Sequence, residues 1–212
     1  MNNDPKIFCI GLNKTGTSSL HHALKILGIK SIHFKNDIGE NIKDMIAQNH
    51  DTNQYLLKGI EEYEAYLDWS HPSTNNLFKE FDKLHPGSKF IFTTRSMDSW
   101  LKSIEKHVKR TPNLKQLRKE NPDNLWLSFD TEFWIKTYQS HHKDVYDYFK
   151  SREEDLLVFD ITNGDRWEKL CDFLELDIPS VAFPEVNTAK SFSLIFRMKR
   201  KAKEIIQKIL GQ

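Results

Sequence analysis

One short loop carries the residue types best suited to chemistry. Gly11 to Ser18 read Gly-Leu-Asn-Lys-Thr-Gly-Thr-Ser, between an apolar run and a segment with helical spacing. A loop between a strand and a helix presents backbone N–H groups and the positive end of the helix dipole to one point, which suits a phosphate. Hydroxyls and a lysine ammonium add donors. The sequence therefore predicts an anion-binding loop whose contacting residues are Asn13, Lys14, Thr15, Gly16, Thr17, Ser18 and Ser19.

The loop differs from the Walker A pattern of ATP-binding enzymes. That pattern, G-x-x-x-x-G-K-[ST], places its lysine directly after the second glycine. Gly11 and Gly16 have the right separation, but Thr17 occupies the lysine position and the lysine comes earlier, at Lys14. A lysine before the second glycine is expected to approach a phosphate from the strand side, near the group that is transferred.

A second candidate anion site follows the apolar run at residues 89–94. Arg95 comes directly after this run, and Ser103 lies eight residues later on the expected helix, where Ser99 and Ser103 share a face because they are four apart. An arginine and a serine can hold a phosphate by forked donors and a hydroxyl. Taken alone, Arg95 would as readily pair with a carboxylate. Two separated sites fit a nucleotide with two phosphate-bearing ends, whereas plain ATP needs only the first.

The elements that position these residues alternate between strand and helix. Short apolar runs predict strands at residues 7–10, 29–34, 63–69, 89–94 and 156–159. Helical spacing predicts helices at 19–27, 38–48, 77–84, 131–150 and 167–174, and one from Ser96 that breaks into a surface insertion within 102–121. This alternation predicts a three-layer α/β domain with a mainly parallel sheet flanked by helices. Ligands of such sheets lie beyond the carboxyl ends of the strands, where Lys14, Asp68, His71 and Arg95 fall.

Composition narrows the class of protein. The 212 residues are 38% hydrophobic and carry a net charge of +1, which is typical of a globular protein and disfavours nucleic-acid binding. We expect one domain over residues 1–190 and a basic amphipathic helix over 191–212, which either docks on the domain or lies on an anionic membrane. The chain has only two cysteines and no apolar run of ~20 residues, so we expect a cytoplasmic protein. The C-terminal helix is the one segment that could bring it to a membrane surface.

Together the motifs resemble those of sulfotransferases that use 3′-phosphoadenylyl sulfate (PAPS). Lys-Thr-Gly-Thr-Ser-Ser is similar to their 5′-phosphosulfate loop, and the strand–Arg–x7–Ser arrangement is similar to their 3′-phosphate motif. Tyr-Leu-Asp-Trp at 66–69, Trp-Glu-Lys-Leu-Cys-Asp-Phe-Leu-Glu-Leu at 167–176 and Phe-Pro-Glu-Val-Asn at 183–187 resemble the small bacterial-type branch, so the resemblance covers residues 6–190. The Arg-Lys-Gly segment of cytosolic members is missing, and Asn187, Thr188 and Lys190 stand in its place.

The resemblance implies a P-loop NTPase-like fold and an activity. The chain would move the sulfuryl group of PAPS to a hydroxyl or amine of a small-molecule, lipid or glycan acceptor and release PAP, without a metal. Lys14 would donate to the bridging oxygen, and His71, Asp68 or His33 would be the general base. The adjacent His141 and His142 are expected at the surface of their helix.

Two other functions stay open from the residues. The first is an ATP-dependent kinase or another P-loop nucleotide enzyme, in which Asp68 or Asp160 would be the acidic residue at a strand end. The second is a non-catalytic nucleotide-binding protein, in which Lys14 would be dispensable. The basic residues within 102–119 either face an anionic acceptor or lie on a solvated helix face. The oligomeric state is not fixed by the sequence.

Overall fold

A five-stranded parallel sheet forms the centre of the protein. The computed structural model describes residues 3–69, 75–120 and 127–186. Within them, the strands are β1 (Ile7–Cys9), β2 (Ser31–His33), β3 (Ala65–Leu67), β4 (Lys89–Thr93) and β5 (Leu156–Phe159), in the order β2-β3-β1-β4-β5. Every pairing is parallel. This confirms the predicted α/β class and the predicted set of strands; β5 has the predicted bounds, and the other four are shorter than their apolar runs.

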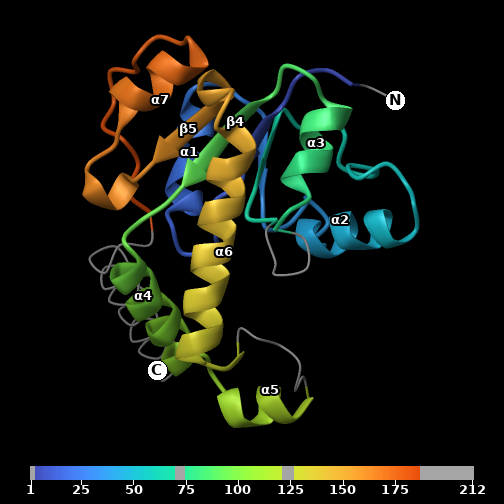
Figure 1. Cartoon of the computed structure of the whole chain (residues 1–212), viewed down its shortest axis with the longest axis vertical. Coiled ribbons are helices and arrows are strands. Elements are labelled where there is room, and N and C mark those ends of the chain that lie inside the picture. Colours follow the sequence, from blue (N-terminus) through green and yellow to red (C-terminus); the bar gives the residue numbers. More distant parts are fainter. Residues whose placement is uncertain (1–2, 70–74, 121–126, 187–212) are drawn as a thin grey trace, which may run out of the picture.

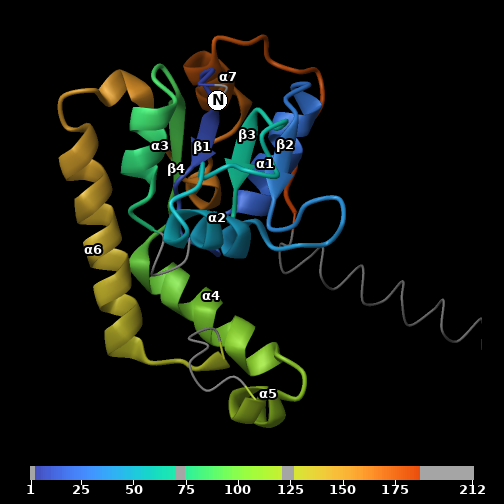
Figure 2. The same cartoon turned by 90° about the vertical axis from the view of Figure 1, so that its right-hand side faces the viewer.

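Helices cover both faces of the sheet (Figures 1 and 2). They are α1 (Thr17–Ile26), α2 (Ile42–Asp51), α3 (Phe78–Leu84), α4 (Met97–Arg110), α5 (Leu114–Glu120), α6 (Thr131–Phe149) and α7 (Trp167–Leu174). Helices α1 and α7 share one hydrophobic cluster with the sheet, and α2, α3 and α6 share the other. The protein therefore has three layers, as predicted.

Alternation along the strands sends neighbouring side chains to opposite layers. On β4, Phe90 and Phe92 join the cluster under α3 and α6, whereas Ile91 joins the one under α1 and α7. Phe8 stacks on Phe81 with ring centroids 4.5 Å apart. Burying each such ring stabilises the fold by about 1.5–3 kcal/mol. The strands are buried on both sides, which explains why their sequences are continuous apolar runs.

Helices α4 and α5 and part of α6 extend beyond the carboxyl edge of the sheet (Figure 1). Helix α4 runs to Arg110, further than the break predicted from residue 102. It continues because Trp100, Ile104 and Val108 recur every four residues and are all buried in a cluster with Trp134 of α6. The chain leaves the helix only at Thr111, directly before a proline.

Two other expectations need correction. Helix α2 starts at Ile42 and not at 38, because residues 36–40 form a turn in which the Glu40 backbone N–H donates to the Asn36 side chain and Ile38 is 80% exposed. His141 is not a surface residue: it is 5% exposed and its Nε2 donates to the Ile10 carbonyl at 2.7 Å. It continues a buried stripe of α6 that includes Val145. The expected C-terminal helix lies outside the described residues.

Both cysteines are buried. The Cys9 sulfur lies 3.6 Å from Thr93 Oγ1, and burial raises the pKa of its thiol to about 11. Burial also raises the pKa of Cys171 on α7. A protonated thiol is a poor nucleophile, so neither cysteine is a reactive group. In the described part of the chain, none of the helices has the length and apolar composition needed to cross a membrane.

Candidate functional site

The β1 and β4 tips meet at Gly11. A Cβ at Gly11 would lie 2.0 Å from Thr93 Oγ1 and 2.2 Å from the Thr93 carbonyl oxygen. Real atoms do not approach so closely, so only glycine lets the chain leave β1 this near to β4. The sheet order also places β1 between β3 and β4, where the chain crosses from one half of the sheet to the other. This is the position at which parallel sheets bind ligands.

The predicted anion-binding loop ends in a helix N-terminus, in residues that are buried or half-buried. Gly16 is the N-cap residue of α1 and adopts a left-handed conformation (φ 109°). It has no side chain that could accept a hydrogen bond from the first N–H groups of the helix. Within the described residues, the backbone N–H groups of residues 14–17 donate to no protein acceptor. A helix N-terminus leaves such donors for water or a ligand. The loop thus has the backbone geometry that an anion requires.

The hydroxyls of the loop are less available than expected. The Thr15 hydroxyl is buried, donates to the Leu12 carbonyl at 2.5 Å and lies 2.7 Å from Thr93 Oγ1. Ser19 Oγ accepts a hydrogen bond from the Val186 backbone N–H at 3.0 Å. Thr15 is 0% exposed, so it shapes the loop from inside and its hydroxyl is not available to a ligand.

The second predicted site lies against the first. Arg95 follows β4, and its Nη1 donates to the Lys14 carbonyl at 3.1 Å, while its Nε donates to Ser99 Oγ at 3.1 Å. Ser103 lies one turn further along α4, half-buried. Burial lowers the pKa of Lys14, the charges of Arg95 and Arg110 lower it further, and Asp68 opposes them. Two cationic side chains are thus held side by side at the carboxyl edge.

Asp68 lies at the β3 tip in a strained backbone conformation. Its φ is 60°, a left-handed value that is unusual for a residue with a side chain. Its Oδ1 accepts a hydrogen bond from the Asn13 side chain, and its side chain is 15% exposed. Burial raises the pKa of this carboxyl to about 6, although the Asn13 bond and the Lys14 charge both lower it. A carboxylate with a pKa this near neutrality suits general-base catalysis.

His33, the third candidate base, belongs to the same cluster. Its Nε2 lies 3.1 Å from Thr17 Oγ1 and 3.8 Å from Asp68 Oδ2. Burial, and then the nearby His22, lower the pKa of His33 to about 4. At neutral pH the ring is therefore uncharged, and its contact with Asp68 is not an ion pair. Its low basicity makes it a weaker base than Asp68.

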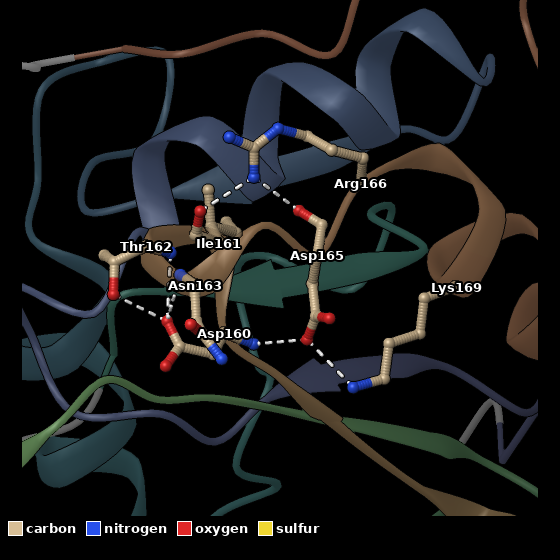
Figure 3. A network of polar contacts seen from close by, with 7 residues as sticks. All are labelled: Asp160, Ile161, Thr162, Asn163, Asp165, Arg166 and Lys169. Carbon is tan, nitrogen blue, oxygen red and sulfur yellow. Dashed lines mark hydrogen bonds and ion pairs between the residues drawn. The ribbon is translucent and has the colours of Figure 1, made fainter.

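A polar network fixes the turn after β5, beside the loop (Figure 3). Asp160 Oδ1 accepts from the backbone N–H groups of Thr162 and Asn163 at 2.9 and 3.1 Å. Asp165 Oδ2 accepts from the Asp160 backbone N–H at 2.7 Å and from Lys169 at 2.8 Å. The network holds the 3₁₀ turn Ile161–Asn163, and a Cβ on Gly16 would lie 3.0 Å from the Ile161 side chain. The turn thus packs against Gly16 of the anion-binding loop.

The chain before residue 187 is tied to the same region. Arg166 Nη2 donates to Glu185 at 2.6 Å, and Val186 donates to Ser19 as described above. The predicted site residues His71, Asn187 and Lys190 lie outside the described residues. The structure therefore brings together the first loop, Asp68, His33 and Arg95, and it describes the chain that leads to residue 187.

Two positioning contacts were missed from the sequence. The Trp100 indole N–H donates to the Asn13 carbonyl at 2.8 Å, and the Tyr138 hydroxyl donates to the Arg95 carbonyl at 2.8 Å. Both residues lie on helical stripes of apolar side chains, which indicated burial but not a polar partner.

A hollow of about 630 Å³ lies along α6 near Asn75 and Asn76, and its lining among the described residues does not include the loop. Across the described part of the chain, no group of three or more His, Cys, Asp or Glu side chains is placed to hold a metal ion.

Comparison with known proteins gives two matches. A family model described as "Sulfotransferase domain" matches residues 6–192. A protein of Aspergillus versicolor named "Ava biosynthesis cluster protein M" is 28% identical over 223 residues, which span 87% of this chain and 81% of that protein. The family match covers both strand tips and the β3 tip with Asp68.

Proposed function

Because the chain belongs to the sulfotransferase family, we propose that its sulfuryl donor is PAPS and that PAP is released. The observation that carries this proposal is the contact between Arg95 and the Lys14 carbonyl. It brings a guanidinium at one strand tip against an amide-rich loop at another, which supports a ligand with two phosphate-bearing ends. A nucleotide with a single phosphate chain would use the loop alone.

The proposed transfer needs little covalent participation by the protein. The bond between sulfur and the bridging oxygen of the donor breaks, and a bond forms between sulfur and the acceptor oxygen or nitrogen. Negative charge grows on the departing 5′-phosphate, and Lys14 with the N–H groups of residues 14–17 stabilises it. The acceptor proton passes to the Asp68 carboxylate. We favour Asp68 over His33 because its pKa is about 6, and His71 stays an alternative base.

The remaining proposed contacts concern the two ends of the nucleotide. Arg95, Ser99 and Ser103 would hold the 3′-phosphate, and Asn187 and Lys190 would complete that contact in place of the missing Arg-Lys-Gly segment. The acceptor is proposed to be a small molecule, lipid or glycan. Since the Aspergillus relative is named for a biosynthesis cluster, small-molecule pools are the first to screen for labelled sulfate transfer from PAPS.

Nucleotide binding tests the donor. PAP should bind without magnesium and more tightly than 5′-AMP, as measured by calorimetry and by a rise in melting temperature. Arg95→Ala should weaken PAP binding about tenfold to hundredfold, because a charge-assisted contact is lost, and should leave 5′-AMP binding unchanged. Stabilisation by ATP that requires magnesium, without a response to PAP, would instead support the kinase alternative.

Turnover tests the role of Lys14. Lys14→Ala should lower kcat about a hundredfold or more while PAP binding is largely kept, because the lysine acts on charge that develops during transfer. Lys109→Ala removes an exposed lysine of α4 and serves as the matched control. Unchanged turnover in Lys14→Ala would remove the lysine from its proposed role, whereas PAP binding without any turnover in the wild type would favour a non-catalytic nucleotide-binding protein.

A further inference from the structure

One helix contacts both strand tips that carry the anion sites. On α6, His141 Nε2 donates to the carbonyl of Ile10, the residue before Gly11, at 2.7 Å. Three residues earlier, the Tyr138 hydroxyl donates to the Arg95 carbonyl at 2.8 Å. Residues three and four apart share a face of a helix, so a single rigid element reaches the end of β1 and the end of β4.

The adjacent His142 adds a second contact between α6 and the chain that follows β4. Its Nδ1 lies 2.9 Å from the Tyr138 carbonyl oxygen, and its Nε2 lies 2.9 Å from Thr94 Oγ1. A carbonyl only accepts, so Nδ1 carries the proton in a neutral ring, and Nε2 accepts from the Thr94 hydroxyl. The rings of Tyr138 and His142 stack with centroids 3.7 Å apart. Both side chains therefore have fixed orientations and defined polar partners.

These contacts do more than fill the core. Each of the three side chains makes a hydrogen bond to one of the first two residues after a strand: Ile10 after β1, or Thr94 or Arg95 after β4. The first strand end leads into the amide-rich loop, and the second carries the guanidinium. Helix α6 therefore contacts the residues that follow β1 and β4, in addition to the direct pairing of these two strands.

We propose that Tyr138, His141 and His142 form a positioning clamp that fixes the separation of the two anion sites and thereby sets the preference for nucleotides phosphorylated at both the 5′ and 3′ positions. The inference rests on the proposed function. Binding at one site raises the effective concentration of the second phosphate at the other only if the spacing is held in advance. A loosened clamp therefore costs affinity for the doubly phosphorylated ligand and leaves the affinity for a singly phosphorylated one unchanged.

Tyr138→Phe tests the clamp with the loss of one oxygen atom. The ring keeps its stacking on His142 and its contact with Trp100, whose ring centroid is 5.4 Å away. We expect PAP to bind about fivefold more weakly and 5′-AMP to bind as before, as measured by titration calorimetry on the full chain. The readout is the ratio of the two affinities, which a general loss of stability would not change.

Tyr148→Phe is the matched control on the same helix. The Tyr148 hydroxyl donates to Asp82 Oδ2 at 2.6 Å, so this variant also loses one hydrogen bond between α6 and the rest of the fold. Its partner is on α3 and not at a strand tip. We expect a lower melting temperature with an unchanged ratio of PAP to 5′-AMP affinity.

A second pair of variants tests the clamp through His142. His142→Phe keeps an aromatic ring but loses the acceptor for Thr94, and the affinity ratio should fall. His142→Gln restores an acceptor oxygen and should recover much of the ratio. A ratio that stays at the wild-type value in both Tyr138→Phe and His142→Phe overturns the clamp, as does an equal loss of affinity for both nucleotides. A wild-type protein with no preference for PAP overturns the proposed donor itself, so the two failures are distinguishable.

Discussion

Replacing Asp68 with asparagine is expected to make the protein more stable and less active at neutral pH. The wild-type carboxyl lies at the β3 tip, 15% exposed, with a pKa raised by burial from 3.8 to about 6. A raised carboxyl pKa means that the fold disfavours the charged form. Asparagine is nearly isosteric, carries no charge and keeps an oxygen to accept the hydrogen bond from Asn13.

The magnitude and its pH dependence follow from this shift. Two pKa units correspond to about 3 kcal/mol of destabilisation once the carboxyl is ionised in both the folded and unfolded states, above pH 6. Below its unfolded pKa of 3.8 the carboxyl is protonated in both states and the effect vanishes. Stability contributed by the raised pKa is therefore lost as the pH rises from 4 to 6. For a chain of this size, the melting temperature of Asp68→Asn should exceed that of the wild type by roughly 6 to 10 °C at pH 7.5.

Melting curves of both proteins between pH 4 and pH 8 measure the difference. Asp172→Asn, at an exposed position of α7, is the control and should follow the wild type. A variant that melts below the wild type at pH 7.5, or a gain that is equal at pH 4.5 and pH 7.5, would refute the reasoning. In the transfer assay, Asp68→Asn should lower kcat about a hundredfold and remove the fall in rate that we expect for the wild type below pH 6.

Three further changes test the architecture. Gly11→Ala should prevent stable folding, measured by circular dichroism, because its Cβ would overlap the Thr93 carbonyl; a folded, active variant would contradict the close approach. Thr15→Val should cost about 1–3 kcal/mol in urea unfolding, because the Leu12 carbonyl loses its hydroxyl donor and the Thr93 hydroxyl loses one of its partners; an unchanged midpoint would show that those bonds are not formed. Asp82→Asn should cost about 1–2 kcal/mol at pH 7: burial raises the pKa of this carboxyl, but the hydrogen bonds from Arg152 and Tyr148 outweigh it and hold the pKa below its ordinary value. That last difference should shrink as the pH falls from the ordinary carboxyl pKa of 3.8, where the unfolded chain takes up the proton first, through the lower pKa of the folded protein; a difference constant with pH would contradict it.

The fold could be predicted largely because its strands are buried on both faces. Apolar runs such as residues 89–94 leave no ambiguity about which segments are central, and glycines or prolines mark many of the helix ends. The start of α2 was misplaced because Ile38 fits the helical period, whereas Asn36 and Glu40 bond to each other and close a turn instead. Local polar bonding overrode the apolar period there.

The site was predicted at the level of motifs but not of contacts. Lys14 was predicted from the glycine-containing loop that follows the first strand, and Arg95 from its place directly after the apolar run at residues 89–94. The bond between Asn13 and Asp68 depends on β3 lying next to β1, and sequence order does not reveal that neighbour. His141 was misjudged because a histidine on a helical stripe is compatible with either water or a buried carbonyl. Only the packed structure decides between the two.

The burial of both thiols makes the protein a convenient subject for site-selective labelling. Cys9 is buried on β1 in the cluster under α1 and α7, Cys171 is buried on α7, and both thiols have a raised pKa. A maleimide reacts with exposed thiolate, so neither native residue should take up a dye while the chain is folded. A pair of cysteines introduced on α4 and α1 would then carry the fluorophores alone. Energy transfer between them would follow the spacing of the two strand ends directly, during turnover.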